Sequence, residues 1–128
     1  MNVLAIIPVY NPDDKFKRLL NMLQRQSLNN LSVLLIDSGT QHEYKKYIKG
    51  DSKFIVKEIA SSEFNHGGTR QLGINMYPDK DIYLFLTQDA ILADENAVKN
   101  LIGCFDDKFV GCAFGRQLPY EDASFFLE

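Results

Sequence analysis

Short and almost uninterrupted apolar runs alternate along this chain with segments whose apolar residues recur at helical spacing. Runs of this kind predict strands that are buried on both faces, as in a parallel sheet. They are Val3 to Pro8, Ser32 to Asp37, Phe54 to Ile59, Asp81 to Leu86 and Val110 to Phe114. Because these strands alternate with helices, the pattern predicts a three-layer α/β/α fold with a mostly parallel central sheet.

The first predicted helix follows the first strand, with Asn11 as its cap and Pro12 in its first turn. It is expected to end between Ser27 and Asn30. Two further helices are predicted from Glu43 to Lys49 and from Gly67 to Met76. A last helix is expected to begin at a capping Asp94. Its apolar face consists of Val98, Leu101, Ile102 and Phe105.

The length of 128 residues is that of one domain, so a single domain over 1–128 is predicted. The net charge of −3 offers neither a basic footprint for nucleic acid nor a polybasic membrane anchor. No apolar run reaches the ~18 residues of a membrane span. The expected location is the cytoplasm, with attachment at the inner face of the cell membrane left open. Cys104 and Cys112 have no zinc-site spacing and are expected to be small buried hydrophobes.

In open parallel sheets, ligands bind beyond the carboxyl ends of the strands. Polar residues and glycines gather directly after the predicted strands of this chain. The candidate site residues at this edge are Pro8, Tyr10, Asn11, Asp37, Gly67, Arg70, Gln88 and Asp89. The turn after the first strand has no glycine, which argues against a GxGxxG dinucleotide site. It also has no acidic pair, which argues against a phosphoacceptor domain.

The residue types at this edge suit a nucleotide held in another way. Tyr10 can stack on a base, and Asp37 can accept a hydrogen bond from a base N–H or a ribose hydroxyl. Arg70 can neutralise a phosphate with paired donors. Asp89 is a hard oxygen ligand of the kind that Mg²⁺ or Mn²⁺ prefers. Gly67 permits either a tight turn or a close approach to a ligand, and both interpretations stay open.

The two histidines are less informative. His66 is interpreted either as a solvated or capping side chain or as a substrate contact. His42 stands beside Glu43 and is expected to be a solvated helix residue.

Four segments, in order along the chain, resemble the inverting glycosyltransferases of family 2, which share the GT-A fold. Ile7 to Asn11 looks like the opening strand motif of that family, and Leu35 to Thr40 looks like its Asp-x-Gly-Ser segment. Asn65 to Gly73 is similar to its GxxxARNxG segment. Tyr83 to Asp89 takes the place of the strand that leads into its DxD motif, with Thr87 in place of the first Asp.

The resemblance implies that Pro8 to Asn11 and Asp37 hold a donor nucleotide and that Arg70 lies near the base or the diphosphate. Asp89 would match the last Asp of DxD and bind Mg²⁺ or Mn²⁺. The segments Phe64 to Arg70 and Thr87 to Ala90 look like the rhamnosyltransferase branch of the family. That branch implies dTDP-rhamnose as the donor, with a UDP-sugar as the alternative, and a saccharide or lipid-linked saccharide acceptor in surface polysaccharide synthesis.

In this family the general base lies in the acceptor half, and Glu121 and Asp122 come too early to match it. The chain is therefore expected to be the nucleotide-binding part alone, cut before the acceptor half. The alternative is a non-catalytic module that binds a nucleotide-sugar. A third hypothesis, another sugar-nucleotide enzyme of similar topology, lacks the usual glycine- and basic-rich first turn. An uncovered acceptor-side face would favour a homo-oligomer.

Overall fold

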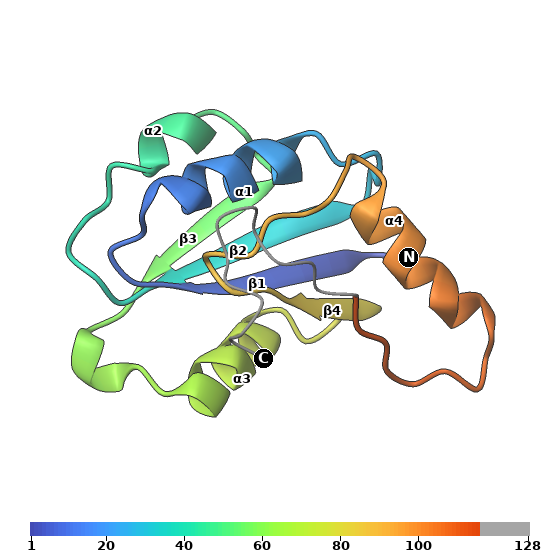
Figure 1. Cartoon of the computed structure of the whole chain (residues 1–128). Helices are drawn as coiled ribbons and strands as arrows, with labels where there is room; N and C mark the ends of the chain where they lie inside the picture. The colour runs from blue at the N-terminus through green and yellow to red at the C-terminus, as the bar shows by residue number, and fades with distance from the viewer. Residues whose placement is uncertain (116–128) are drawn as a thin grey trace, which may run out of the picture.

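A parallel sheet of four strands forms the centre of the computed structural model, which describes residues 1–115 (Figure 1). The strands are β1 (Val3–Val9), β2 (Leu31–Asp37), β3 (Phe54–Glu58) and β4 (Ile82–Phe85). Their order in the sheet is β3-β2-β1-β4, and each neighbouring pair is parallel. β1 and β2, the two central strands, are buried along almost their whole length. This arrangement confirms the predicted mostly parallel sheet.

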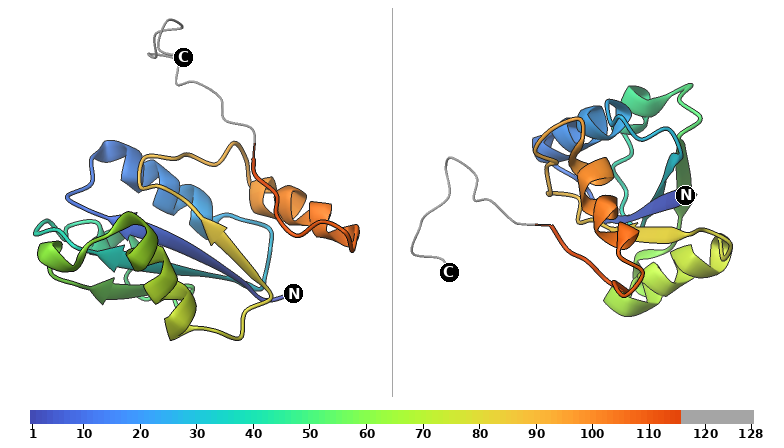
Figure 2. Two further views of the ribbon diagram at one scale, coloured as in Figure 1. Left: turned by 90° about the horizontal axis from the view of Figure 1, so that it is seen from below. Right: turned by 90° about the vertical axis from the view of Figure 1, so that its right-hand side faces the viewer.

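Helices cover both faces of this sheet, as the right-hand view of Figure 2 shows. α1 (Asp14–Gln24), α2 (Lys45–Ile48) and α4 (Ala97–Ile102) pack on one face. α3 (His66–Met76) packs on the other face. Alternate residues of β1 serve the two layers, because successive side chains of a strand point to opposite faces: Ile7 packs with the α1 side and Ile6 with α3. Two short 3₁₀ turns are η1 (Ser61–Glu63) and η2 (Gly103–Asp106).

The start of α1 differs from the prediction. Asp13 caps the helix by accepting a hydrogen bond from the Lys15 N–H at 3.0 Å. Asn11 instead has a left-handed backbone with a φ of 39°, a conformation that asparagine tolerates better than most residues. The helix ends at Gln24, before the predicted end near Ser27. The local pattern located the helix correctly but assigned its cap to the wrong residue.

The predicted fifth strand is wrong within the described residues. Val110 to Phe114 has no regular structure and pairs with no strand in the range 1–115. Phe114 is 91% exposed, and Cys104 and Cys112 are exposed rather than buried. An apolar run becomes a strand only when a neighbouring strand satisfies its backbone groups, and periodicity alone does not identify that neighbour.

The last helix also begins later than predicted. Asp94 lies in the preceding turn, where its side chain accepts a hydrogen bond from the Asn96 N–H at 2.8 Å. No helix between residues 1 and 115 has the length and apolarity needed to cross a membrane. The expectations about Glu121, Asp122 and the end of the chain concern residues outside the described range.

Candidate functional site

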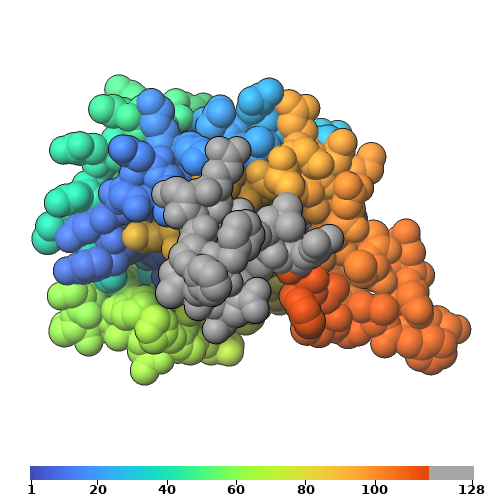
Figure 3. All heavy atoms as spheres, viewed as in Figure 1, coloured from blue at the N-terminus to red at the C-terminus, as the bar shows by residue number. Residues whose placement is uncertain are grey.

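The carboxyl ends of the strands meet at one edge of the sheet, where four predicted site residues converge. In the space-filling view, the exit of β1 lies at this edge between the segment after β2 and the start of α3 (Figure 3). A cavity of about 180 Å³ opens here. It is lined by Pro8, Val9, Tyr10, Phe64, His66, Arg70, Thr87 and Gln88. The predicted residues Pro8, Tyr10, Arg70 and Gln88 therefore come together from three separate segments.

Gln88 joins the ends of β1 and β4. Its Oε1 accepts a hydrogen bond from the Tyr10 N–H at 2.7 Å, and its Nε2 donates to the Tyr10 carbonyl at 3.1 Å. The side-chain amide thus pairs with the main chain of Tyr10 as a neighbouring strand would. Tyr10 is 58% exposed and lines the cavity. An exposed aromatic ring held by its own backbone is suited to stacking on a planar ligand.

The start of α3 forms the opposite wall. Asn65 caps the helix by accepting from the Gly68 N–H at 2.9 Å. The rings of Phe64 and His66 meet edge to face, with centroids 5.0 Å apart. Arg70 donates through Nη1 to the carbonyl of His66 at 2.7 Å. That bond fixes one nitrogen of the guanidinium and leaves its remaining donors for a phosphate or a base.

α3 approaches the sheet closely at Gly73. A Cβ at this position would lie 2.8 Å from Cδ1 of Ile6, which is fully buried in β1. Gly73 therefore allows the helix to lie directly on β1. Because Arg70 and His66 are on the same helix, this contact also sets their distance from Tyr10. Gly67, by contrast, has ample room for a side chain, since its nearest neighbour is Oδ1 of Asn65 at 3.9 Å.

Asn11 ties the exit of β1 to the exit of β2. Its Oδ1 accepts hydrogen bonds from the N–H groups of Thr40 at 2.8 Å and Gln41 at 2.9 Å. The same contact brings Gly39 so close that a Cβ there would lie 2.7 Å from the backbone nitrogen of Asn11. The Asn11 side chain was predicted to hold a nucleotide, but in the structure it binds the backbone of the turn of residues 38–41.

Asp37 has no exposed surface and is fully engaged within the protein. Its Oδ1 accepts from the Gly39 N–H at 2.9 Å, and its Oδ2 accepts from the Tyr44 hydroxyl at 2.6 Å. His42 Nδ1 lies 2.7 Å from the same Oδ2. Burial of the phenol, followed by its hydrogen bond to Asp37, raises the pKa of Tyr44 well above the usual tyrosine range. Asp37 therefore shapes the site from within the fold.

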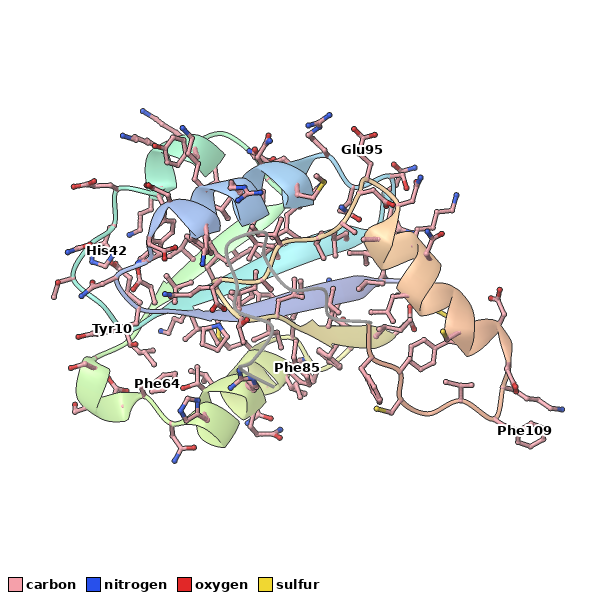
Figure 4. All side chains as sticks on the ribbon, in the orientation of Figure 1. Tyr10, His42, Phe64, Phe85, Glu95 and Phe109 are labelled. Carbon is pink, nitrogen blue, oxygen red and sulfur yellow. The ribbon has the colours of Figure 1, made fainter. Side chains whose placement is uncertain are left out.

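His42 does not lie on a solvated helix face, contrary to the prediction. The residue precedes α2, and its imidazole lies between two carboxylates. Nδ1 is on Asp37, and Nε2 is 3.3 Å from Oε1 of Glu58 at the end of β3. Figure 4 shows His42 at the same end of the sheet as Tyr10 and Phe64. Sequence spacing did not reveal this contact, because His42 and Glu58 belong to different elements.

Asp89 lies in the turn after β4 and is exposed. Within residues 1–115 its carboxylate has no hydrogen bond or ion pair, and no group of three or more His, Cys, Asp or Glu side chains is placed to hold a metal. One free carboxylate fits Mg²⁺ or Mn²⁺ in sites where substrate phosphates and water supply the other ligands. Asp89 is therefore suited to hold a metal that arrives with a diphosphate, and not to a closed protein cage.

A second and larger hollow, of about 580 Å³, lies between α2 and β3. Lysines line its rim, and Ile48, Phe54 and Val56 contribute apolar surface. None of the predicted site residues lines it, and the smaller cavity at the strand ends is the one that combines aromatic, basic and amide groups. Phe64 and Thr87 also line that smaller cavity, although neither was predicted from the sequence to contact a ligand. Their positions next to Asn65 and Gln88 in the sequence could have indicated that they lie at the site.

Comparisons with known proteins show what the chain is similar to. Residues 4–127 match the family model described as glycosyl transferase family 2. The chain is 39% identical over 124 residues to the O-antigen chain rhamnosyltransferase RfbN of Salmonella typhimurium. It is 34% identical over 120 residues to the O-antigen chain rhamnosyltransferase WbaN of Salmonella anatum. These alignments cover 97% and 93% of this chain but only 40% and 38% of the two relatives.

Solved structures share the fold at lower sequence identity. A mannosyltransferase from Pyrobaculum calidifontis, in complex with GDP-Man and Mn²⁺, matches 86% of this chain and 34% of its own, with a TM-score of 0.74 and 16% identity. S. aureus TarS 1-349 in complex with UDP matches 94% of this chain and 38% of its own, with a TM-score of 0.69 and 20% identity. Sequence and fold together place the chain: it belongs to glycosyl transferase family 2 and has the GT-A type of α/β fold.

Proposed function

We propose that the protein transfers rhamnose from dTDP-rhamnose to a saccharide or lipid-linked saccharide acceptor. The transfer inverts the configuration at the anomeric carbon and serves the synthesis of a surface polysaccharide. The observation that carries the proposal is the cavity in which Tyr10, Arg70 and Gln88 converge beside Asp89. The names of the two Salmonella relatives support rhamnose and O-antigen. The chain spans about 40% of their length, so the activity is proposed for the whole protein.

Each group at the cavity has a definite task in this proposal. The Tyr10 ring stacks on the base, while Gln88 holds the Tyr10 backbone in place. Arg70 offers its remaining guanidinium donors to the diphosphate. Asn11 and Asp37 hold the turn of residues 38–41, and Gly67, in the first turn of α3, leaves room beside the nucleotide. Asp89 would hold Mg²⁺ or Mn²⁺, and the metal would supply Lewis-acid stabilisation of the departing nucleoside diphosphate.

In the transfer step, the oxygen of an acceptor hydroxyl forms a bond to the anomeric carbon from the face opposite the diphosphate. The bond from that carbon to the diphosphate oxygen breaks, and the proton of the hydroxyl passes to a general base outside residues 1–115. We also propose that the protein works in the cytoplasm at the inner face of the membrane, where a lipid-linked acceptor is accessible. The membrane location rests on the class of acceptor.

The test is calorimetric titration of the intact protein with dTDP, UDP and GDP, with and without Mn²⁺. Binding of dTDP that strengthens with the metal is the expected result. Asp89→Ala should abolish the metal-dependent part, because the carboxylate is the proposed metal ligand. Asp79→Ala, which removes an exposed carboxylate from the α3–β4 turn, is the matched control and should bind like the wild type.

Two outcomes would overturn the proposal. If the wild-type protein bound none of the three nucleotides, the site would not be a nucleotide site. If Asp89→Ala kept the full metal dependence, the metal would be held elsewhere. Sugar transfer from dTDP-rhamnose, followed by release of dTDP, then tests the activity itself. Nucleotide binding without turnover would favour a non-catalytic module.

A further inference from the structure

The buried carboxylate of Asp37 needs a countercharge. Asp37 is completely buried at the end of β2, and removing an ion from water costs several kcal/mol unless partners compensate. Three donors reach it: the Gly39 N–H, the Tyr44 hydroxyl and the His42 imidazole. Of these three, only the imidazole can carry a positive charge. His42 is therefore the one side chain of the three that can place a positive charge against Asp37.

The position of the ring defines which hydrogen bonds it makes. A carboxylate only accepts hydrogen bonds, so Nδ1 of His42 must donate to Asp37. Nε2 faces a second carboxylate, that of Glu58, at 3.3 Å, and Lys45 approaches the same Glu58 oxygen at 3.1 Å. The protonated imidazole satisfies both contacts, and the neutral ring with hydrogen on Nδ1 keeps the contact to Asp37. The contact to Asp37 is the shorter one and ends on a fully buried carboxylate, whereas Glu58 is half exposed.

Asp37 connects the His42 contact to the edge of the cavity. Its Oδ1 holds the Gly39 N–H, which fixes the turn of residues 38–41. The same turn donates two N–H groups to Asn11, the residue next to Tyr10. A short chain of contacts thus runs from His42 through Asp37 and Asn11 to the exposed aromatic ring at the mouth of the cavity.

We infer that His42 is a positioning residue of the nucleotide site. Its Nδ1 holds the carboxylate of Asp37, and Asp37 in turn shapes the turn of residues 38–41 without contacting the ligand itself. The inference rests on the proposed nucleotide-binding function and adds a residue to it. It assigns the shaping of the turn after β2 to the half-buried His42 and the fully buried Asp37. It also assigns the Glu58 contact only a secondary part.

Two amide substitutions separate the two ring nitrogens. The side-chain nitrogen of asparagine occupies the place of Nδ1, and that of glutamine occupies the place of Nε2. His42→Asn should keep the bond to Asp37 and bind dTDP within about twofold of the wild type. His42→Gln and His42→Ala should weaken binding roughly tenfold or more, the effect of losing a hydrogen bond to a charged group. Glu58→Gln is the matched control and should bind like the wild type.

Amide hydrogen exchange at Thr40 and Gln41 supplies a readout that does not depend on the ligand. Protection should persist in His42→Asn and Glu58→Gln and should fall in His42→Gln and His42→Ala. Unchanged protection and unchanged dTDP affinity in His42→Gln would overturn the inference, as would loss of both in His42→Asn with the fold intact. Failure of the wild-type protein to bind any nucleoside diphosphate would instead overturn the proposed function, and with it the nucleotide part of this inference. The exchange data would still decide whether His42 positions the turn.

Discussion

At the scale of single residues, the polar side chains nearest the cavity mostly bond to the protein itself. Asn11 and Gln88 each use their amide groups to hold a neighbouring backbone segment. Asp37 lies beneath the turn that Asn11 holds, with no buried side-chain polar atom left unpaired in residues 1–115. A satisfied polar network of this kind fixes a unique geometry, because an unpaired member would be costly. The exposed Tyr10 and Asp89, and the remaining donors of the partly buried Arg70, are left to meet a ligand.

The hydrogen bond from Tyr44 to Asp37 is testable through its pH dependence. Tyr44→Phe removes one donor from a buried carboxylate and should lower the free energy of unfolding by about 1–3 kcal/mol at neutral pH. Burial, followed by the contact to Asp37, raises the pKa of Tyr44 in the folded protein. The stabilisation is therefore complete below the ordinary value of 10.0 and is lost as the pH rises above it, where the unfolded phenol ionises.

Urea denaturation of the wild type and of Tyr44→Phe between pH 7 and pH 11 measures this effect, with pH values chosen around the ordinary tyrosine titration. The difference in free energy of unfolding between the wild type and Tyr44→Phe should be constant up to about pH 9.5 and should become smaller above it. A difference that is constant over the whole range would show that the phenol is not protected in the folded state. Tyr47→Phe, at an exposed tyrosine in α2, the helix that follows Tyr44, provides the control.

At the scale of elements, the site depends on how closely α3 lies on β1. The helix has a buried glycine where it meets Ile6, and His66 and Arg70, both among its first five residues, contribute to the cavity wall. Asn65 defines the start of the helix by capping it. The helix is therefore placed by one close contact in its middle and one cap at its beginning, and both affect the position of Arg70.

Gly73→Ala should destabilise the fold, because the new Cβ would lie 2.8 Å from Cδ1 of Ile6. The cost of overpacking exceeds the helix propensity gained from alanine, so a net loss of about 1 kcal/mol or more is expected. Ile6→Val in the same protein removes Cδ1 and should recover part of the loss. Gly103→Ala, where the added Cβ meets open space, should be neutral or slightly stabilising. Urea denaturation of the four proteins checks these expectations, and equal losses in the two alanine variants would contradict them.

At the scale of the whole molecule, one buried glutamine connects the first third of the described chain to its last helix. Gln26 follows α1 and is 7% exposed. Its Nε2 donates to the carbonyls of Asp94 at 2.8 Å and Met22 at 3.1 Å, and its Oε1 accepts from the Val98 N–H at 3.1 Å. This side chain therefore docks α4 against the end of α1.

Gln26→Ala should lower the free energy of unfolding by about 1–3 kcal/mol, because the buried Val98 N–H and the part-buried Asp94 carbonyl lose their partner. Limited proteolysis should cut the segment of residues 86–96 faster than in the wild type. Arg25→Gln removes the neighbouring exposed ion pair with Glu95 and should cost less than about 1 kcal/mol. If Gln26→Ala behaved like Arg25→Gln, α4 would not depend on this docking contact.

The amino-acid sequence by itself determined the architecture and the edge at which the chemistry lies. Apolar runs such as Val3 to Pro8 specify buried strands, because a strand covered on both faces has no polar alternation. The alternation with helices then requires parallel strands, whose carboxyl ends share one edge. Pro8, Tyr10, Arg70 and Gln88 were found at that edge for this reason, and they do line one cavity.

Only the tertiary structure decided which polar groups face each other. Tyr10 and Gln88 are 78 positions apart, and Asn11 and Thr40 are 29 apart, so no local pattern relates them. The same reason explains the errors at Asn11, His42 and Val110 to Phe114: a cap, an ion pair and a strand each depend on a partner that the fold brings in. Hydrophobic periodicity records which side of a segment is buried. The identity of the neighbour on that side depends on how the whole chain packs.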